Sequence, residues 1–311
     1  MRAGMAGVIA DPDDVPMPDR RLVDLEVVQR LIASQFPQWT DLPVRPVASS
    51  GWDNQTFHLG DHMSIRLPTA REYALAVTKE HQWLPVLATQ VPLRIPVPIA
   101  KGVPGEGFAF PWSVYEWIDA EPASTAGIGD PSAFAERLAG FLAALRAADP
   151  VGGPEPGLHS WYRGGSLRVW DRQAREAIEA LGGHVPRDAV TEIWESALRS
   201  DWDGQPVWFH GDVALGNLLV RDGALAAVID FGTCGVGDPS CDLAIAWTVL
   251  SGAAREAFRS GIGADDGTWA RGRGWALWKT LTTYARELRY DDAESQAEVA
   301  EARRVLGEIL A

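Results

Sequence analysis

The sequence predicts an α+β protein of two lobes, with a β-rich N-terminal lobe and a mainly helical C-terminal lobe. Short apolar segments bounded by turn residues are concentrated in residues 44–118, a pattern typical of strands. Beyond residue 130, apolar residues recur mostly at helical spacing. A length of 311 residues is sufficient for two such units. We expect a flexible arm over residues 1–20, the N-terminal lobe over 21–117 and the C-terminal lobe over 118–311.

In the N-terminal lobe, a helix is expected over residues 24–36, where Leu25, Val28 and Leu31 recur at helical spacing before Pro37. A second helix is expected over residues 72–88. The segment that follows it is rich in Pro and Gly and suits loops and edge strands. Strands are expected at residues 44–48, 55–59, 64–67 and 113–118, with a tight turn at residues 49–54.

In the C-terminal lobe, Asp130 followed by Pro131 is a strong helix start, because a capping side chain precedes a proline at the first helical position. One β-like section, residues 207–231, interrupts the helical pattern. Further helices are expected at residues 167–181, 188–200, 241–250 and 275–288, and near the C-terminus.

The charge balance is acidic, with 28 Lys and Arg residues against 42 Asp and Glu residues and a net charge of −14. It argues against nucleic acid and anionic membranes as partners, because both are polyanionic. The longest apolar run, near residues 243–250, is far below the ~20 residues of a membrane span. Two cysteines make no disulfide framework, and the start has no signal-peptide pattern. We therefore expect a cytoplasmic protein.

The section of residues 207–232 carries the chemistry. A short strand delivers Asp212 to a loop, and a hairpin follows. The two ends of this hairpin carry Asn217 and Asp230, so three oxygen-bearing side chains converge at one edge. Asp and Asn are common in turns, but the compound pattern is far more specific than any of its parts.

This set of side chains fits phosphoryl transfer. Mg²⁺ takes oxygen ligands, typically one or two from the protein together with phosphate oxygens and water. An amide and a carboxylate are suitable, which assigns Asn217 and Asp230 as metal ligands. A further carboxylate is needed to orient and deprotonate the acceptor hydroxyl, and Asp212 takes that catalytic role.

Three motifs mark the chain: His210-Gly211-Asp212 with Asn217, then Asp230-Phe231-Gly232, then Gly237-Asp238-Pro239-Ser240-Cys241-Asp242-Leu243-Ala244. They resemble the motifs of the aminoglycoside phosphotransferase family, which has a two-lobed protein-kinase-like fold. The resemblance implies a nucleotide bound between the lobes and a small-molecule hydroxyl as acceptor. Gly211 stands where protein kinases have arginine, which favours small-molecule kinases. The resemblance also implies that Asp242 braces the catalytic loop, and we expect His210 to orient the same loop.

A turn over the nucleotide phosphates is a further implication of the resemblance. Residues 49–54 lie between the first two strands, where such a turn is expected. Within it, Ser50, Gly51 and Asn54 are the residues expected to bind the nucleotide, since backbone amides and hydroxyls of a tight turn can cradle phosphate. The segment is not a GxGxxG motif, and an ordinary hairpin turn is the alternative.

A cation on the third strand should contact the α- and β-phosphates, and in this fold it is normally lysine. The chain has only three lysines, Lys79, Lys101 and Lys279, and none falls on that strand. Arg66 occupies the position, and Glu80 on the following helix should fix it by an ion pair. For Glu80, a solvated helix charge is the alternative. The Arg-x-Pro pattern after a Ser-Gly-x-Asp turn resembles the macrolide phosphotransferase branch, which tends to use GTP, so both ATP and GTP stay open as donors.

The nucleotide base is expected to dock on the strand that links the lobes. Backbone groups of Glu116 and Trp117 would hydrogen bond to the base, and Tyr115 would lie near the back of the pocket. Packing in the core is an equally compatible interpretation for the side chains of Tyr115 and Trp117. The acceptor pocket should open beside Asp212, and its candidate residues are Trp161, Arg163, Trp275, Trp278, Tyr284, Asp291 and Asp292.

We therefore expect a Mg²⁺-dependent phosphotransferase that moves the γ-phosphate of ATP or GTP to a hydroxyl of a small molecule, such as an aminoglycoside or macrolide antibiotic. The acidic net charge favours a cationic or sugar-bearing acceptor. Two alternatives stay open. One is a metabolic kinase for an amino alcohol or a sugar, and the other is a pseudokinase that binds nucleotide without catalysis. The arginine at position 66 is the only support for the pseudokinase.

Overall fold

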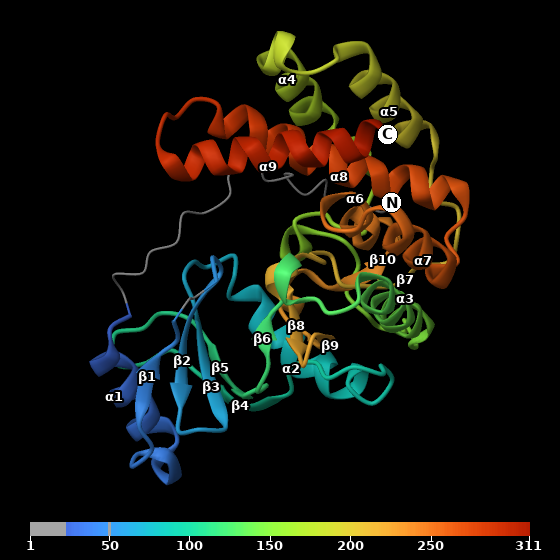
Figure 1. Ribbon diagram of the computed structural model, residues 1–311. Coiled ribbons are helices and arrows are strands. Elements are labelled where there is room, and N and C mark those ends of the chain that lie inside the picture. The colour runs from blue at the N-terminus through green and yellow to red at the C-terminus, as the bar shows by residue number, and fades with distance from the viewer. Residues whose placement is uncertain (1–22, 49–50) are drawn as a thin grey trace, which may run out of the picture.

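The computed structural model describes residues 23–48 and 51–311, which form two lobes (Figure 1). A five-stranded sheet with two helices makes the first lobe, and helices around two small sheets make the second. The two-lobed α+β architecture expected from the sequence is confirmed. The expected arm over residues 1–20 and the phosphate-turn residue Ser50 lie outside the described residues. In the part of the chain that the structure describes, no helix is both long enough and apolar enough to cross a membrane.

The five-stranded antiparallel sheet places one charged side chain near its centre. On the strand β3, Arg66 pairs in register with Thr56 of one neighbouring strand and Ser113 of the other. Ladder hydrogen bonds on both sides therefore fix the backbone at Arg66. The strand order is β1-β2-β3-β5-β4, with β1 at Val44–Pro46, β2 at Asn54–Leu59, β3 at Met63–Pro68, β4 at Pro98–Gly102 and β5 at Trp112–Glu116.

Helix α1, Leu25–Gln35, packs against this sheet and completes the core of the first lobe. Its start is fixed by Asp24, whose carboxylate accepts a hydrogen bond of 2.7 Å from the N–H of Val27. Its apolar residues recur at three- and four-residue spacing, so one face of the helix is buried against the sheet. The buried contacts join Val28, Leu31 and Ile32 of the helix to Phe57, Ile65 and Trp112 of the sheet.

Helix α2, Leu75–Leu87, connects the two lobes. Its residues Leu84 and Leu87 are part of the apolar core of the second lobe. One helical turn earlier, Glu80 is buried beside β3 of the first lobe. The helix can therefore place charged side chains between the sheet and the loops of the second lobe.

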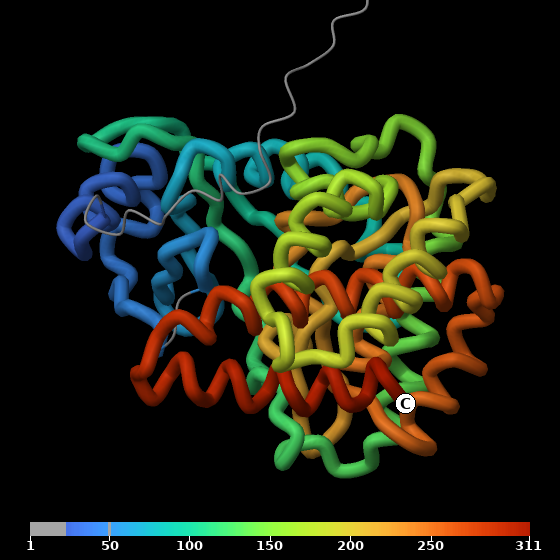
Figure 2. Tube along the Cα trace, turned by 90° about the horizontal axis from the view of Figure 1, so that it is seen from above, coloured from blue at the N-terminus to red at the C-terminus, as the bar shows by residue number. Residues whose placement is uncertain are grey.

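The second lobe contains seven α-helices among the described residues. As expected, the carboxylate of Asp130 caps the first of them, accepting hydrogen bonds from the N–H groups of Ser132 and Ala133. The two longest, α8 and α9, lie side by side along one flank of the lobe (Figure 2). The helices are α3 Pro131–Ala147, α4 Asp171–Leu181, α5 Arg187–Arg199, α6 Ile245–Thr248, α7 Gly252–Ile262, α8 Asp266–Glu287 and α9 Ala293–Leu310.

The helix predictions for residues 241–288 need three corrections. The expected helix over 241–250 is split into a 3₁₀ turn, Pro239–Ala244, and the short helix α6, and the buried carboxylate of Asp242 in the turn binds the backbone N–H groups of His210 and Gly211. Helix α7 was not expected. Helix α8 begins at Asp266 rather than near Trp275, because the side chain of Asp265 caps the N–H of Thr268.

The expected hairpin is present and belongs to a three-stranded sheet of order β6-β8-β9. Its turn residues Asp222 and Gly223 both have positive φ, as a two-residue turn with the twist of a hairpin requires. Where the hairpin ends, the N–H of Val228 donates to the carbonyl of Arg94, which links it to the segment before β4. The bounds are β6 Glu121–Pro122, β8 Leu218–Arg221 and β9 Ala224–Val228, while β7 Val207–Phe209 pairs separately with β10 Gly235–Gly237.

Candidate active site

The loop between β7 and β8 turns sharply at Gly211. This residue has a φ of +91°, a conformation that side chains with a Cβ rarely adopt. A Cβ at this position would also lie 2.8 Å from the hydroxyl and 2.9 Å from the carbonyl oxygen of Thr233. The turn after β7 therefore requires glycine, which explains why a larger residue does not stand between His210 and Asp212.

Asp212, the candidate base, has both carboxylate oxygens engaged. Its Oδ2 accepts a hydrogen bond of 3.1 Å from the amide nitrogen of Asn217, and its Oδ1 lies 3.1 Å from the ammonium of Lys279. Burial by itself raises the pKa of Asp212, but the positive charges of Lys279 and Arg163 outweigh burial and hold this pKa well below its usual value. The carboxylate is therefore ionised at neutral pH.

Asn217 and Asp230, the candidate metal ligands, lie at the two ends of the hairpin. The N–H of Ile229 donates to the carbonyl of Asn217 at 2.8 Å, which brings Asp230 next to Asn217. The amide nitrogen of Asn217 is bonded to Asp212, so the amide oxygen is the atom suited to a cation. Asp230 has a φ of +65°, an uncommon conformation that turns the chain sharply at this ligand position.

The guanidinium of Arg66 lies between the carboxylates of Asp230 and Glu80. Its guanidinium lies 3.0 Å from the carboxylate of Asp230 and 3.9 Å from that of Glu80, so the expected pair with Glu80 is present. Glu80 also accepts a hydrogen bond from the hydroxyl of Tyr115. Burial lowers the pKa of Arg66, but Asp230 and Glu80 outweigh it and raise that pKa, so Arg66 stays charged.

The described part of the phosphate turn brings an unexpected carboxylate, Asp53, to the cleft. The hydroxyl of Thr69 bonds to the carbonyls of Trp52 and Asp53 and holds the turn against the end of β3. Burial, followed by the nearby charge of Asp230, raises the pKa of Asp53 to about 7. The other two predicted residues lie where expected: Gly51 is in the turn and Asn54 begins β2.

Two backbone N–H groups of the segment that links the lobes already make hydrogen bonds within the protein. The N–H of Glu116 donates to the carbonyl of Val97, and that of Trp117 donates to the carbonyl of His62. The N–H groups of Glu116 and Trp117, which were expected to bond to a base, are therefore already occupied by the carbonyls of Val97 and His62. The side chain of Tyr115 is buried in the core, whereas the half-buried ring of Trp117 packs on His58 with centroids 4.2 Å apart.

Lys79 is buried between helix α2 and the loop that follows Asp230. Its ammonium donates to the carbonyls of Gly232 at 2.7 Å and Cys234 at 2.9 Å, and it lies 3.0 Å from Nδ1 of His159. Lys79 therefore links the loop that follows Asp230 to the helix that carries Glu80. Lys79 falls inside the helix expected over residues 72–88, and no local pattern in α2 indicates partners so far along the chain.

The carboxylate of Asp242 and the ring of His210 both make hydrogen bonds that hold the loop of Asp212. The carboxylate of Asp242 accepts hydrogen bonds of 2.9 Å from the N–H of His210 and 2.7 Å from that of Gly211. His210 Nδ1 accepts from the N–H of Asp212, and its Nε2 then donates to the carbonyl of Ile229 at 3.0 Å. Both ring nitrogens are used for positioning, which leaves none to act as a base.

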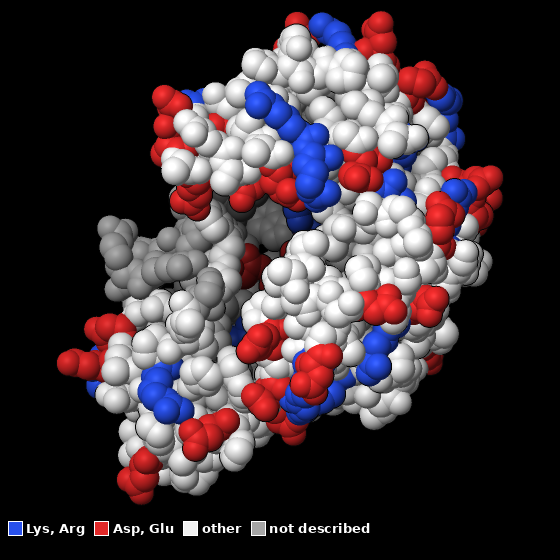
Figure 3. Space-filling model, viewed as in Figure 1, with Lys and Arg blue, Asp and Glu red and all other residues white. Residues whose placement is uncertain are grey.

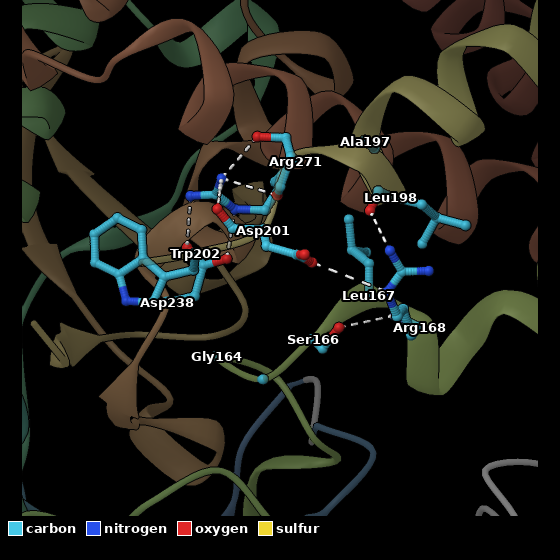
Figure 4. A pocket seen from close by; sticks show the side chains of 12 residues that line it. Gly164, Ser166, Leu167, Arg168, Ala197, Leu198, Asp201, Trp202, Asp238 and Arg271 are labelled. Atoms are coloured by element: carbon cyan, nitrogen blue, oxygen red, sulfur yellow. Dashed lines mark hydrogen bonds and ion pairs between the residues drawn. The ribbon is translucent and has the colours of Figure 1, made fainter. Parts of the chain in front are cut away.

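A buried ion pair fixes helix α8 to the segment that follows β10. In a cavity of about 280 Å³, Arg271 lies 2.7 Å from Asp238, and its guanidinium also reaches Ser200 and packs over Trp202 (Figure 4). Both charged side chains are buried, so removing either one would leave the other as an unpaired buried charge. Because Arg271 stands on α8, this pair sets the position of Trp275, Trp278 and Lys279 further along the helix.

A deep hollow separates the lobes (Figure 3), and a pocket of about 200 Å³ opens beside Asp212. Three of the acceptor candidates line that pocket, namely Arg163, Trp275 and Trp278. The other four do not. Tyr284 is buried and bonded to Arg303, Asp292 caps α9, Asp291 bonds to Gln296, and Trp161 packs near Tyr73. Lys279, for which no role was expected from the sequence, also lines the pocket.

Solved structures share this architecture. The GDP and kanamycin complex of APH(2″)-IIia has a TM-score of 0.68 at 21% identity, over 91% of this chain and 97% of that one. Macrolide 2′-phosphotransferase MphH from Brachybacterium faecium has a TM-score of 0.58 at 23% identity, over 89% and 98%. These likenesses establish the fold.

Sequence comparison gives the family. An aminoglycoside 3′-phosphotransferase of Escherichia coli is 38% identical over 60 residues, which are 19% of this chain and 22% of that relative. The match spans about a fifth of the relative's length. A model of the phosphotransferase enzyme family, APH, matches residues 44–275, which include the phosphate turn, Arg66 and the loop of Asp212. The chain belongs to the phosphotransferase enzyme family.

Proposed function

We propose that this phosphotransferase moves the γ-phosphate of ATP or GTP to a hydroxyl of a small molecule, with Asp212 as the base. The observation that supports the proposal is that two contacts lie in one cleft. Asn217 bonds to Asp212 in the second lobe, and Arg66 of the first lobe pairs with Asp230 of the second. A base, two metal-ligand candidates and a phosphate-binding cation therefore come together from both lobes.

Asn217 and Asp230 would hold Mg²⁺ through an amide oxygen and a carboxylate, the hard ligands this ion prefers. When bound, the ion neutralises charge on the phosphate oxygens. Among residues 23–48 and 51–311, no group of three or more His, Cys, Asp or Glu side chains could hold a metal. Two protein ligands together with nucleotide phosphates are therefore the arrangement that fits these residues.

In the proposed reaction Asp212 orients the acceptor hydroxyl and takes its proton as the oxygen bonds to the γ-phosphorus. The bond from that phosphorus to the β–γ bridging oxygen breaks, and the nucleoside diphosphate leaves. The low pKa of Asp212 keeps it ionised before the reaction. Arg66, fixed by Glu80 and Asp230, supplies positive charge for the phosphates.

The test is a radiolabelled γ-phosphate transfer screen with ATP and GTP in parallel and Asp212→Asn as the variant. We expect Asp212→Asn to lose transfer by at least about 10²-fold while nucleotide binding stays nearly intact. Asp230→Asn should weaken Mg²⁺-nucleotide binding itself. Asp222→Asn, in the exposed hairpin turn, is the matched control. Normal transfer by Asp212→Asn would refute the assignment of the base.

The identity of the acceptor class is tested with a panel in the same screen. Aminoglycosides and macrolides enter it because the similar structures are phosphotransferases with those names. Choline-like amines and sugars represent the metabolic-kinase alternative. The pseudokinase alternative predicts nucleotide binding without transfer to any acceptor. The joint presence of Asp212, Asn217 and Asp230 favours catalysis, since degenerate kinases usually lose at least one such group.

A further inference from the structure

The pocket beside Asp212 has apolar walls. Its lining includes the loop residues after Asp212 and the indoles of Trp275 and Trp278. The two rings pack edge to face with centroids 5.7 Å apart, and Trp278 donates to Gln173, so the wall is rigid. A volume of about 200 Å³ suits a single ring of an acceptor.

The charges that line this pocket are already paired, except for one cation. Asp212 is paired with Lys279 at 3.1 Å, and Glu301 is paired with Arg304 at 2.6 Å. Arg163 also lines the pocket, and its side chain makes no ion pair or hydrogen bond with any residue in the described part of the chain. Within those described residues, no carboxylate of the pocket is left for an incoming ammonium group.

One hydrogen-bond donor in the wall is unused. Trp275 is 3% exposed, and its indole Nε1 finds no hydrogen-bond partner among the described residues. The nitrogen is closed off from solvent, so it adds no polar group to the pocket surface, and the wall that Trp275 forms is apolar.

We propose that this pocket takes an uncharged alcohol with an apolar face, and that Lys279 is the residue that excludes acceptors with ammonium groups near the reacting hydroxyl. The inference rests on the proposed function, because it takes Asp212 as the acceptor's base. An ammonium placed here would meet Lys279 and Arg163 and would lose water without gaining a carboxylate partner. The net charge of −14 therefore does not describe the local field at Asp212.

A matched pair of small alcohols tests the proposal by binding alone. The probes are trans-2-methylcyclohexanol and trans-2-aminocyclohexanol, which share ring and hydroxyl and differ in a methyl against an ammonium group. Binding to the nucleotide-free protein is followed by tryptophan fluorescence. We expect wild type to bind the methyl compound at least about tenfold more tightly, since a charge contact of this kind is worth at least that factor. Equal binding, tighter binding of the amine, or no binding of the methyl compound would overturn the proposal.

Variants assign the selectivity to Lys279. In Lys279→Met we expect the preference for the methyl compound over the amine to shrink at least about fivefold. Lys101→Met is the matched control, because Lys101 bonds to Thr78 on the exposed side of the first lobe. If Lys279→Met keeps the full preference for the methyl compound over the amine, Lys279 does not exclude ammonium groups and the proposal is refuted.

The phosphate-transfer screen separates this inference from the proposed function. If the methyl compound binds with the expected selectivity but no alcohol is phosphorylated, the proposed function fails and the selectivity of the pocket stands. If transfer occurs and polycationic acceptors are the best substrates, the function stands and the inference is refuted.

Discussion

The guanidinium of Arg66 lies 3.0 Å from the carboxylate of Asp230, although the two residues are 164 positions apart. Arg66 comes from the sheet of the first lobe, and Asp230 follows the hairpin of the second. The second carboxylate on Arg66, that of Glu80, comes from the helix that connects the lobes. One side chain therefore joins three separate elements at the proposed phosphate site.

Replacing Arg66 with lysine should weaken nucleotide binding. A lysine carries a single point charge and cannot span both Asp230 and Glu80 as the forked guanidinium does. We expect Arg66→Lys to raise KM for ATP or GTP by about tenfold and Arg66→Met by more. Steady-state kinetics with both nucleotides measure the effect. Arg45→Lys, at an exposed ion pair, is the control, and an unchanged KM in Arg66→Lys would contradict the assignment.

Asp242→Asn should lower kcat while leaving nucleotide KM nearly unchanged. The carboxylate of Asp242 accepts from two backbone N–H groups, whereas an amide would turn one N–H₂ group toward a donor. The loop of Asp212 would shift, and a shift of this size costs up to about 10²-fold in rate. Single-turnover kinetics check the prediction. A loss confined to KM would indicate that Asp242 acts on the nucleotide rather than on the catalytic loop.

Lys79→Met should destabilise the protein. The substitution keeps the apolar stem but leaves the carbonyls of Gly232 and Cys234 buried without their donor. We expect a loss of about 3 kcal/mol in the free energy of unfolding, since hydrogen bonds to charged groups are each worth about 1.5–3 kcal/mol. Urea denaturation measures it. The exposed Lys101→Met should change stability by less than about 0.5 kcal/mol, as surface substitutions do.

Asp53 should make stability depend on pH when metal and nucleotide are absent. Its pKa is raised from 3.8 to about 7, first by burial and then by Asp230. Between these values the folded state holds a proton that the unfolded state has released, so stability falls as pH rises from about 4 to about 7. Above this window the loss is complete and stays constant.

Asp53→Asn removes this titration, and we expect it to raise Tm at pH 8 by about 2 °C, the effect of roughly 1 kcal/mol in a chain of this length. At pH 4 wild type and variant should be equal. Scanning calorimetry in EDTA at both pH values checks the pattern. A variant that lowers Tm at pH 8 would show that the carboxylate stabilises the turn instead.

Local signals in the sequence predicted much of the fold. Asp130 and Pro131 start a helix wherever the rest of the chain lies, and the positive φ of Asp222 and Gly223 follows from the turn they form. Such features depend on neighbours a few residues away, so periodicity and capping rules can identify them. The predictions for helix ends were less accurate. Asp265 and Asp242 accept hydrogen bonds from backbone N–H groups that the spacing of apolar residues does not identify.

By itself, the sequence determined the set of Asp212, Asn217 and Asp230, because a strand, a loop and a hairpin must bring these residues together. Only the tertiary structure decided the surroundings of that set. Lys279 reaches Asp212 across 67 positions, and Lys79 reaches Gly232 across 153. No local pattern encodes such contacts, since they depend on how α2 and α8 pack against the loops. None of the three lysines lies on the third strand, but the fold brings two of them, Lys79 and Lys279, into contact with the loops of the site.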